Sequence, residues 1–145
     1  MDTHAAGSDH RFMTESELLA MPESDYMNTA QLDYFRQRLT VMKRELVENA
    51  QATGVHLRAT EVAADPVDRA TLEEEHALEL RVRDRERKLL KKIDSTLRRI
   101  DDGSYGYCEE TGEPIGLKRL LARPTATLSL EAQERRENLQ RTQRE

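Results

Sequence analysis

The sequence has little material for a large hydrophobic core. It contains no tryptophan, and of its 145 residues only 4% are aromatic and 37% hydrophobic, while 35% are charged. A chain of this length and composition forms one compact core at most, and its charge content suits long helices with solvated faces. We therefore expect a mainly α-helical (all-α) protein with a small globular head.

Signals for export and for membrane insertion are also lacking. The chain has one cysteine, so no intrachain disulfide can form. Residues 1–13 lack the basic region and the apolar run of a signal peptide, and no apolar run approaches membrane-spanning length. These absences predict a cytoplasmic protein that has no membrane partner.

The chain also lacks an excess of positive charge. Its net charge is -5 and its pI is about 5.5. Non-specific affinity for DNA comes mainly from the neutralisation of phosphates, for which an acidic chain is poorly suited. The composition therefore favours a protein partner over direct DNA binding.

A polar N-terminal arm precedes the first long helical pattern. In the arm, Thr14 and Glu17 have the spacing of a capping box ahead of a short helix that Pro22 ends. The long helix should begin at Asn28 as its N-cap, and its apolar residues recur every three or four positions, as in a coiled-coil seam. The apolar residues are Leu18, Leu19 and Met21 in the short helix, and Leu32, Phe35, Leu39, Met42 and Leu46 in the long one.

The second long helix has a strong start signal. Asp65 suits the N-cap, Pro66 the first helical position and Asp68 the third, where a carboxylate favours the helix dipole. We expect the helix to end near Gly103. Its seam is polar at His76, Glu79, Arg83 and Glu86, and apolar at Leu90, Ile93, Leu97 and Ile100.

If the chain folds back at Pro66, the apolar half of the first helix's seam lies opposite the apolar half of the second helix's seam; we call these the apolar half-seams. Leu39 then falls opposite Ile93, and Leu46 falls opposite Glu86. With a rise of 1.5 Å per residue, each arm would be roughly 50 Å long. The pattern therefore predicts a long antiparallel coiled-coil hairpin.

This hairpin divides the chain into four expected parts. Residues 1–27 form an arm with a short helix and belong to the head, and 28–103 form the coiled coil, with its tip at about 61–70. Residues 104–128, rich in glycine and proline, form a degenerate zinc-finger-like region, and 129–145 form a C-terminal helix.

Charge is sorted along the second long helix, with acids near the tip and bases toward the head. One interpretation is a solvated face with pairs such as Asp84 with Lys88 and Glu79 with Arg83. The other is a docking surface for an anion or an acidic protein. The acids are Glu73, Glu74, Glu75 and Glu79, and the bases are Arg81, Arg83, Arg85, Arg87, Lys88, Lys91, Lys92, Arg98 and Arg99.

A degenerate metal-binding frame occupies the head. Cys108, Thr111, Ser129 and Ala132 have the spacing C-x2-C-x17-C-x2-C, which with four cysteines would be a tetrahedral zinc signature. Only one good ligand is present, so we predict no zinc and interpret Cys108 as a small, partly buried apolar residue rather than a reactive thiol. The head must then be held by the packing of Ile115, Leu117, Leu120, Leu121 and Leu128.

The two carboxylates at the tip also have two interpretations. Asp65 and Asp68 suit a helix start, but paired carboxylates could also serve acid-base catalysis or hold magnesium. The rest of an active site is missing from the sequence: there is no glycine-rich phosphate loop and no nucleophile with a base at a readable spacing. We predict a protein without enzymatic activity and without catalytic residues.

Several motifs occur in order along residues 26–136. They are Asp65-Pro66-Val67-Asp68-Arg69-Ala70, Glu73-Glu74-Glu75, the stretch from Arg83 to Ile93, Tyr105-Gly106-Tyr107-Cys108, Ile115-Gly116 and Ala122-Arg123-Pro124-Thr125-Ala126. Together they resemble the DksA family of bacterial transcription regulators, which bind RNA polymerase without a DNA site. The degenerate cysteine frame is similar to that of the cysteine-poor, zinc-independent members.

The resemblance implies a mechanism in which the coiled coil enters the secondary channel of RNA polymerase and the tip modulates transcription initiation. By this likeness, Asp65, Asp68 and Ala70 match the functional tip. It also implies ppGpp as co-regulator in the stringent response, at the interface between polymerase and the base of the coiled coil. The positions matching that interface are Leu89, Lys92 and Arg123, and Gln133 replaces a family lysine there, which removes one phosphate-pairing charge.

Two other functions are compatible with the same pattern. One is a structural adaptor whose coiled coil pairs with itself or with another helix. The other is a transcript-cleavage factor of the secondary-channel type, whose tip carboxylates hold magnesium. For the DksA-like function we expect a monomer that has bacterial RNA polymerase as its partner.

Overall fold

The computed structural model describes residues 13–63 and 69–144, and the side chains within 13–52 and 69–143. Over these residues the chain is helical apart from turns, loops and one isolated bridge between Tyr107 and Pro114. It divides into two compact units: the head, which consists of the residues up to Arg38 and from Arg99 onward, and the helix-pair unit, Leu39–Arg98.

The short helix of the N-terminal arm, α1 (Glu15–Leu19), begins with the predicted capping box. The backbone N–H of Thr14 donates to Oε1 of Glu17 at 2.8 Å, and the N–H of Glu17 donates to Oγ1 of Thr14 at 3.1 Å. Leu18 is fully buried, whereas Leu19 is 42% exposed. A 3-10 turn, η2 (Glu23–Asp25), leads from this helix to the first long one.

The first long helix, α2 (Thr29–Ala63), starts directly after the predicted N-cap. Oδ1 of Asn28 accepts the backbone N–H of Gln31 at 2.9 Å, and Oε1 of Gln31 accepts the N–H of Met27 at 2.8 Å. These two bonds satisfy donors that the helix itself leaves without partners. The predicted start at Asn28 is therefore explained by its side chain.

The second long helix, α3 (Arg69–Asp102), ends where the sequence predicts. Gly103 follows it with φ +87°, a conformation that favours glycine, and the N–H groups of Ser104 and Tyr105 both donate to the carbonyl of Arg99. The start predicted at Asp65 and Pro66 lies outside the described residues.

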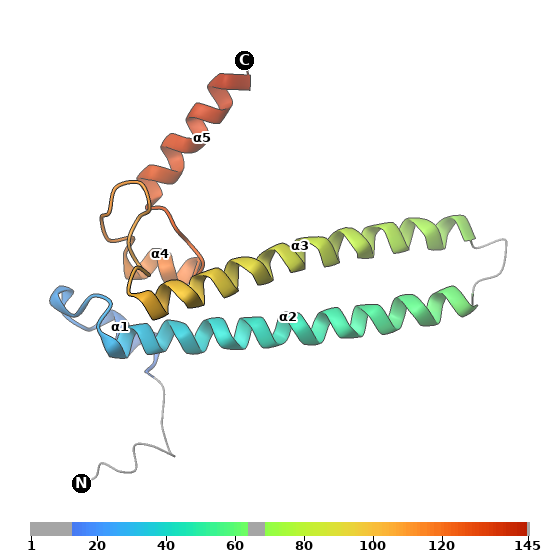
Figure 1. The fold of residues 1–145 in the computed structure, drawn as a ribbon, viewed down its shortest axis with the longest axis horizontal. Helices are drawn as coiled ribbons and strands as arrows, with labels where there is room; N and C mark the ends of the chain where they lie inside the picture. Colours follow the sequence, from blue (N-terminus) through green and yellow to red (C-terminus); the bar gives the residue numbers. More distant parts are fainter. Residues whose placement is uncertain (1–12, 64–68, 145) are drawn as a thin grey trace, which may run out of the picture. The chain divides into compact units, whose positions relative to one another are not determined.

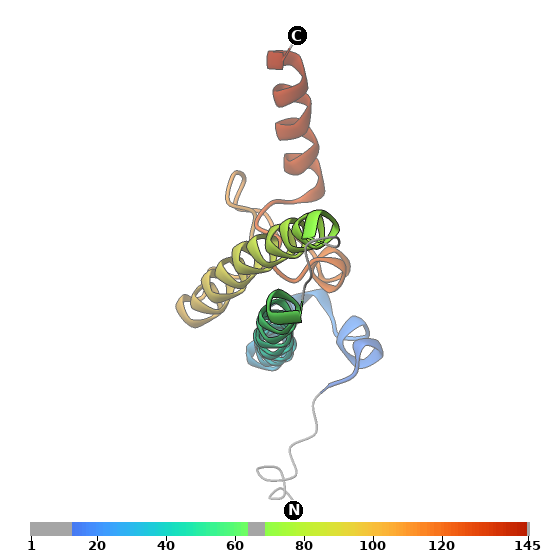
Figure 2. The ribbon, with the colours of Figure 1, turned by 90° about the vertical axis from the view of Figure 1, so that its right-hand side faces the viewer.

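The helices α2 and α3 run side by side in opposite directions, which confirms the predicted antiparallel pair (Figure 1; Figure 2). Two ion pairs follow this arrangement: Arg36 with Asp101 at 2.7 Å in the head, and Lys43 with Asp94 at 2.8 Å in the helix-pair unit. One heptad forward along α2 corresponds to one heptad backward along α3. The antiparallel register is therefore continuous over this part of the pair.

In the described part of the helix-pair unit, the buried side chains lie near its two chain ends, Leu39 and Arg98. Leu39, Ile93 and Thr96 are fully buried. The hydroxyl of Thr96 donates to the carbonyl of Lys92 at 2.7 Å, so this polar group is satisfied within α3. The apolar half-seam predicted at these positions is confirmed by the burial of Leu39 and Ile93.

The head adds two short elements to the ends of the long helices. These are α4 (Leu117–Ala122) and α5 (Leu130–Arg144). Of α5, Ala132 is fully buried, while the side chains from 134 to 143 are all exposed. The buried hydrophobic residues of the head are Leu18, Phe35, Ile100, Tyr105, Cys108, Ile115, Leu120, Leu121, Leu128 and Ala132.

Candidate functional site

Of the three residues matched to the functional tip, the structure describes only Ala70. Asp65 and Asp68 lie outside the described residues, and Ala70 is exposed in the first turn of α3. The prediction of a functional carboxylate pair at the tip therefore stays a prediction.

The basic stretch of α3 is partly used by pairs within the same helix. The predicted pair of Asp84 with Lys88 is present at 3.2 Å, and Arg87 also reaches Asp84 at 3.5 Å. All three side chains are more than half exposed, so each pair contributes little to stability. These contacts favour the solvated-face interpretation for this part of the stretch.

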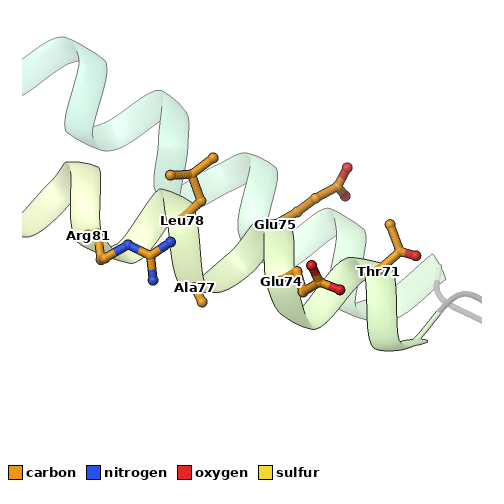
Figure 3. Close-up of a pocket in the computed structure, with 6 residues that line it drawn as sticks. All are labelled: Thr71, Glu74, Glu75, Ala77, Leu78 and Arg81. Carbon is orange, nitrogen blue, oxygen red and sulfur yellow. The ribbon is translucent and has the colours of Figure 1, made fainter.

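Two shallow hollows lie on the outer surface of α3 and share Arg81. Leu78 and Leu80, which line one hollow each, are 55% and 53% exposed. These two leucines lie off the seam positions, so the apolar periodicity of α3 did not indicate them. The first hollow, of about 430 Å³ and shown in Figure 3, is lined by Thr71, Glu74, Glu75, Ala77, Leu78 and Arg81, and the second, of about 570 Å³, by Leu80, Arg81, Asp84, Arg85 and Lys88.

The four residues matched to a ppGpp interface belong to different units. In the helix-pair unit, Leu89 is half-buried and Lys92 is exposed. In the head, Arg123 is exposed at the end of α4, and the half-buried Gln133 donates from Nε2 to Oε2 of Glu137 at 2.9 Å. The amide of Gln133 is thus engaged within α5 and carries no positive charge.

The four positions of the degenerate metal frame have other structural roles. Cys108, Ser129 and Ala132 are buried, while Thr111 is exposed. The hydroxyl of Ser129 accepts the N–H of Ala132 at 3.2 Å and so caps α5, and Oγ1 of Thr111 accepts the N–H of Glu113 at 3.2 Å. Two of the four frame positions therefore stabilise turns and helix ends rather than offering a metal ligand.

The thiol of Cys108 is more acidic than an ordinary thiol. Burial alone would raise its pKa, but hydrogen bonds from the Thr111 hydroxyl and from the backbone N–H groups of Ser129, Thr111 and Glu110 outweigh burial and lower the pKa to about 6. Cys108 is also 3% exposed. These hydrogen bonds favour the thiolate form of a shielded sulfur, which the interpretation as a small apolar residue did not include.

Tyr26 joins the N-terminal arm to both sides of the zinc-finger-like loop. Its hydroxyl donates to the carbonyl of Gly106 at 2.7 Å and accepts the N–H of Gly116 at 2.9 Å, while its ring lies edge-on to Tyr107 with centroids 5.7 Å apart. A Cβ added at Gly106 would meet Cγ of Met27 at 2.7 Å, so the arm packs closely on the loop. We call these contacts the Tyr26 clamp.

Further contacts hold the same loop to the rest of the head. The buried hydroxyl of Tyr105 donates to the carbonyl of Pro124 at 2.8 Å, and burial raises the pKa of Tyr105. Nη2 of Arg136 on α5 donates to Oε2 of Glu110 at 2.6 Å. Hydrogen bonds and packing therefore connect the segments that a metal would join in a zinc finger.

Comparison with known proteins identifies the family of this chain. Residues 31–100 match the family model of the DnaK suppressor protein DksA, N-terminal domain, and residues 103–138 match that of the prokaryotic dksA/traR C4-type zinc finger. A protein of Caulobacter vibrioides named RNA polymerase-binding transcription factor DksA is 54% identical over 132 residues, which cover 90% of this chain and 93% of that protein. The chain belongs to the DksA family.

Other DksA relatives agree with this placement. The protein of the same name from Escherichia coli strain K12 is 50% identical over 112 residues, which cover 76% of this chain and 74% of that protein. The solved structure of transcription factor DksA2 from Pseudomonas aeruginosa has a TM-score of 0.83 and 49% identity, and covers 88% of this chain and 99% of that one. The predicted resemblance and the predicted fold class are both confirmed.

DksA-family membership also bears on enzymatic activity and metal binding. The relatives are named as transcription factors, and the chain is not an enzyme. Within residues 13–63 and 69–144, no three His, Cys, Asp or Glu side chains come together in a way that could hold a metal ion. The single cysteine of the matched zinc-finger region therefore does not fit a tetrahedral zinc site.

No helix in the described part of this DksA-family chain combines the length and the apolar composition needed to span a membrane.

Removal of the Tyr26 hydroxyl should destabilise the head. Tyr26→Phe deletes the donor to Gly106 and leaves the N–H of Gly116 without its acceptor, which costs about 1–3 kcal/mol of unfolding free energy. Chemical denaturation followed by circular dichroism measures this loss. The matched control is Tyr107→Phe, whose parent side chain is 37% exposed and should change stability little. Equal stability of the two variants would contradict a structural role for the clamp.

The hydrogen bonds to the Cys108 sulfur should make stability depend on pH. The folded pKa of about 6 lies below the ordinary value of 9.0, so the thiolate stabilises the fold fully above pH 9, less as pH falls, and not at all below about pH 6. The difference in unfolding free energy between the native chain and Cys108→Ala should therefore be larger at about pH 8 than at about pH 5.5. A difference that is equal at the two pH values would show that the thiolate does not contribute.

Proposed function

We propose that this chain binds bacterial RNA polymerase and regulates transcription initiation without a DNA site of its own. The observation that carries the proposal is the likeness, over 90% of the chain, to a protein named RNA polymerase-binding transcription factor DksA. The net charge of -5 supports a protein partner rather than nucleic acid, because an acidic chain neutralises phosphates poorly.

The helix pair is the part of the chain suited to reach into the polymerase. Helix α2 has 35 residues and α3 has 34. At 1.5 Å per residue each is roughly 50 Å long, which exceeds the diameter of an ordinary small domain. We infer that the pair enters the secondary channel and that Asp65, Asp68 and Ala70 act at its tip, near the catalytic centre of the polymerase.

The proposed co-regulator is ppGpp, bound between the polymerase and the base of the helix pair. Lys92 and Arg123 are exposed and cationic, which suits contact with phosphates, and Leu89 supplies an apolar neighbour on α3. Gln133 contributes no phosphate-pairing charge, and its amide already donates to Glu137. We expect a response to ppGpp that depends mainly on the two cations.

The head is proposed to fold without zinc. The Tyr26 clamp, the Tyr105 bond to Pro124 and the Arg136 bond to Glu110 join its segments in place of a metal. The proposed setting is the cytoplasm, and the proposed working form is a monomer that joins the polymerase.

Metal content tests the zinc-free head. Elemental analysis of the purified native chain should find far less than one zinc per chain, and a strong chelator should leave the thermal unfolding midpoint unchanged, because no metal-linked stability is present to be lost. About one tightly bound zinc per chain, or a large chelator-induced drop in the midpoint, would contradict the proposal.

Transcription from a ribosomal RNA promoter with purified polymerase tests the main function. The native chain should lower transcript output, and more so with ppGpp. Asp68→Asn should bind polymerase with unchanged affinity but lose most of the effect on output, because it removes a charge at the tip and not a docking contact.

The matched control for the tip variant is Glu74→Gln, which also neutralises one carboxylate and changes an exposed position on the outer side of α3. This variant should regulate as the native chain does. If the native chain leaves transcription unchanged both with and without ppGpp, the proposed function is wrong. If Glu74→Gln and Asp68→Asn lose activity equally, the tip assignment fails even though the main function stands.

A further inference from the structure

One row of side chains on the outer surface of α3 combines exposed charge with exposed apolar surface. Glu74, Leu78, Arg81 and Arg85 are spaced by four, three and four residues, which places them on one face of a helix. All four are exposed, Leu78 by 55%, and the first three line the hollow shown in Figure 3. We call these four residues the α3 stripe.

The α3 stripe is separate from the contacts described above for this helix. The seam positions do not include any of its four residues, and the ion pairs of Asp84 with Arg87 and Lys88 also lie off it. An exposed leucine set between charged side chains gains free energy when another surface covers it. The stripe is therefore suited to docking, and the order of its charges indicates the partner.

The charges of the α3 stripe are arranged so that the stripe is complementary to itself. Its acid, Glu74, lies at one end, and its cations, Arg81 and Arg85, lie toward the other. The four positions are symmetric about the midpoint between Leu78 and Arg81. A second α3 laid antiparallel along the stripe therefore sets Glu74 opposite Arg85 of the other copy, and two-fold symmetry repeats each contact.

We propose that the α3 stripe docks against the same stripe of a second copy of this chain, in an antiparallel two-fold arrangement. Each Glu74 pairs with Arg85 of the other copy, and each Leu78 packs on the aliphatic stem of Arg81 of the other copy. A parallel arrangement would set Glu74 against Glu74 and Arg85 against Arg85, so repulsion between like charges excludes it.

The docked surface is small, because it is one face of a few turns of a single helix. It falls below the roughly 800 Å² per partner of a standard stable interface, so the dimer is weak and reversible, with a dissociation constant on the order of 10–100 µM. The dimer is a form of the free chain. The monomer remains the form that joins the polymerase.

Sedimentation velocity of the full native chain measures this self-association. The average mass should rise from that of a monomer toward that of a dimer as the concentration increases from about 5 to about 500 µM. A native chain that stays monomeric over the whole range would overturn the proposal.

Charge reversal within the stripe tests the register. Glu74→Arg, and independently Arg85→Glu, should each weaken self-association at least about tenfold, because each replaces two contacts between opposite charges with two between like charges. A mixture of the two variants should form a heterodimer about as readily as the native chain dimerises, since every pair across the interface is again of opposite charge. A mixture that associates no better than the separate variants would show that the register is wrong.

The matched control is Glu73→Arg, which makes the same change of charge at an exposed position of α3 beside the stripe. This variant should dimerise as the native chain does, and it should not restore association when mixed with Arg85→Glu. If Glu73→Arg behaves as Glu74→Arg does in both measurements, net charge rather than the stripe controls association, and the proposal fails.

Binding to purified polymerase separates a second copy from the other possible occupant of the stripe. If the native chain stays monomeric while Arg85→Glu weakens polymerase binding, the stripe serves the polymerase, and the proposed dimer is wrong. Self-association concerns the free chain alone, so it can fail while the proposed regulation of transcription stands, and the reverse.

Discussion

The buried residue Tyr105 makes the contacts on which the head depends. Its ring packs on Phe35 of α2 with centroids 5.5 Å apart, its backbone N–H bonds to Arg99 at the end of α3, and its hydroxyl bonds to Pro124 after α4. One side chain thus joins three segments that are distant in sequence, with its polar group satisfied. The Tyr26 clamp holds the next residue, Gly106, and Leu120 is fully buried in the same head.

A head held in this way differs from a metal-held one in how its stability is distributed. A tetrahedral zinc concentrates several bonds at one point, and their loss unfolds a small domain outright. Here the same segments are joined by separate contacts, each of modest free energy, through Tyr26, Tyr105 and Arg136. Loss of one such contact weakens the head and leaves the others in place.

Local rules explain which parts could be predicted from the sequence. The capping box at Thr14, the start of α2 at Asn28 and the end of α3 before Gly103 follow from residues within a few positions of one another. The apolar seam that buries Ile93 follows from helical periodicity, and the site positions at Lys92 and Arg123 came from family likeness alone.

Two kinds of feature could not be predicted from the sequence. The first is contact between segments that are distant in sequence, and the second is how far each seam position is shielded from water. Tyr26 bonds to residues 80 and 90 positions away, and no periodicity relates them. The acidity of Cys108 depends on backbone donors that the loop brings together. Nε2 of His76 and Oε1 of Glu86 are buried without a hydrogen-bond partner among the described residues, and no sequence pattern shows which polar seam positions are shielded in this way.

The outer half of α5 has a practical consequence, because its side chains from 134 to 143 are exposed and the buried Ala132 lies before them. A fluorophore or an affinity handle attached at Leu139 would leave the core intact, so α5 provides a site from which to observe the protein at work.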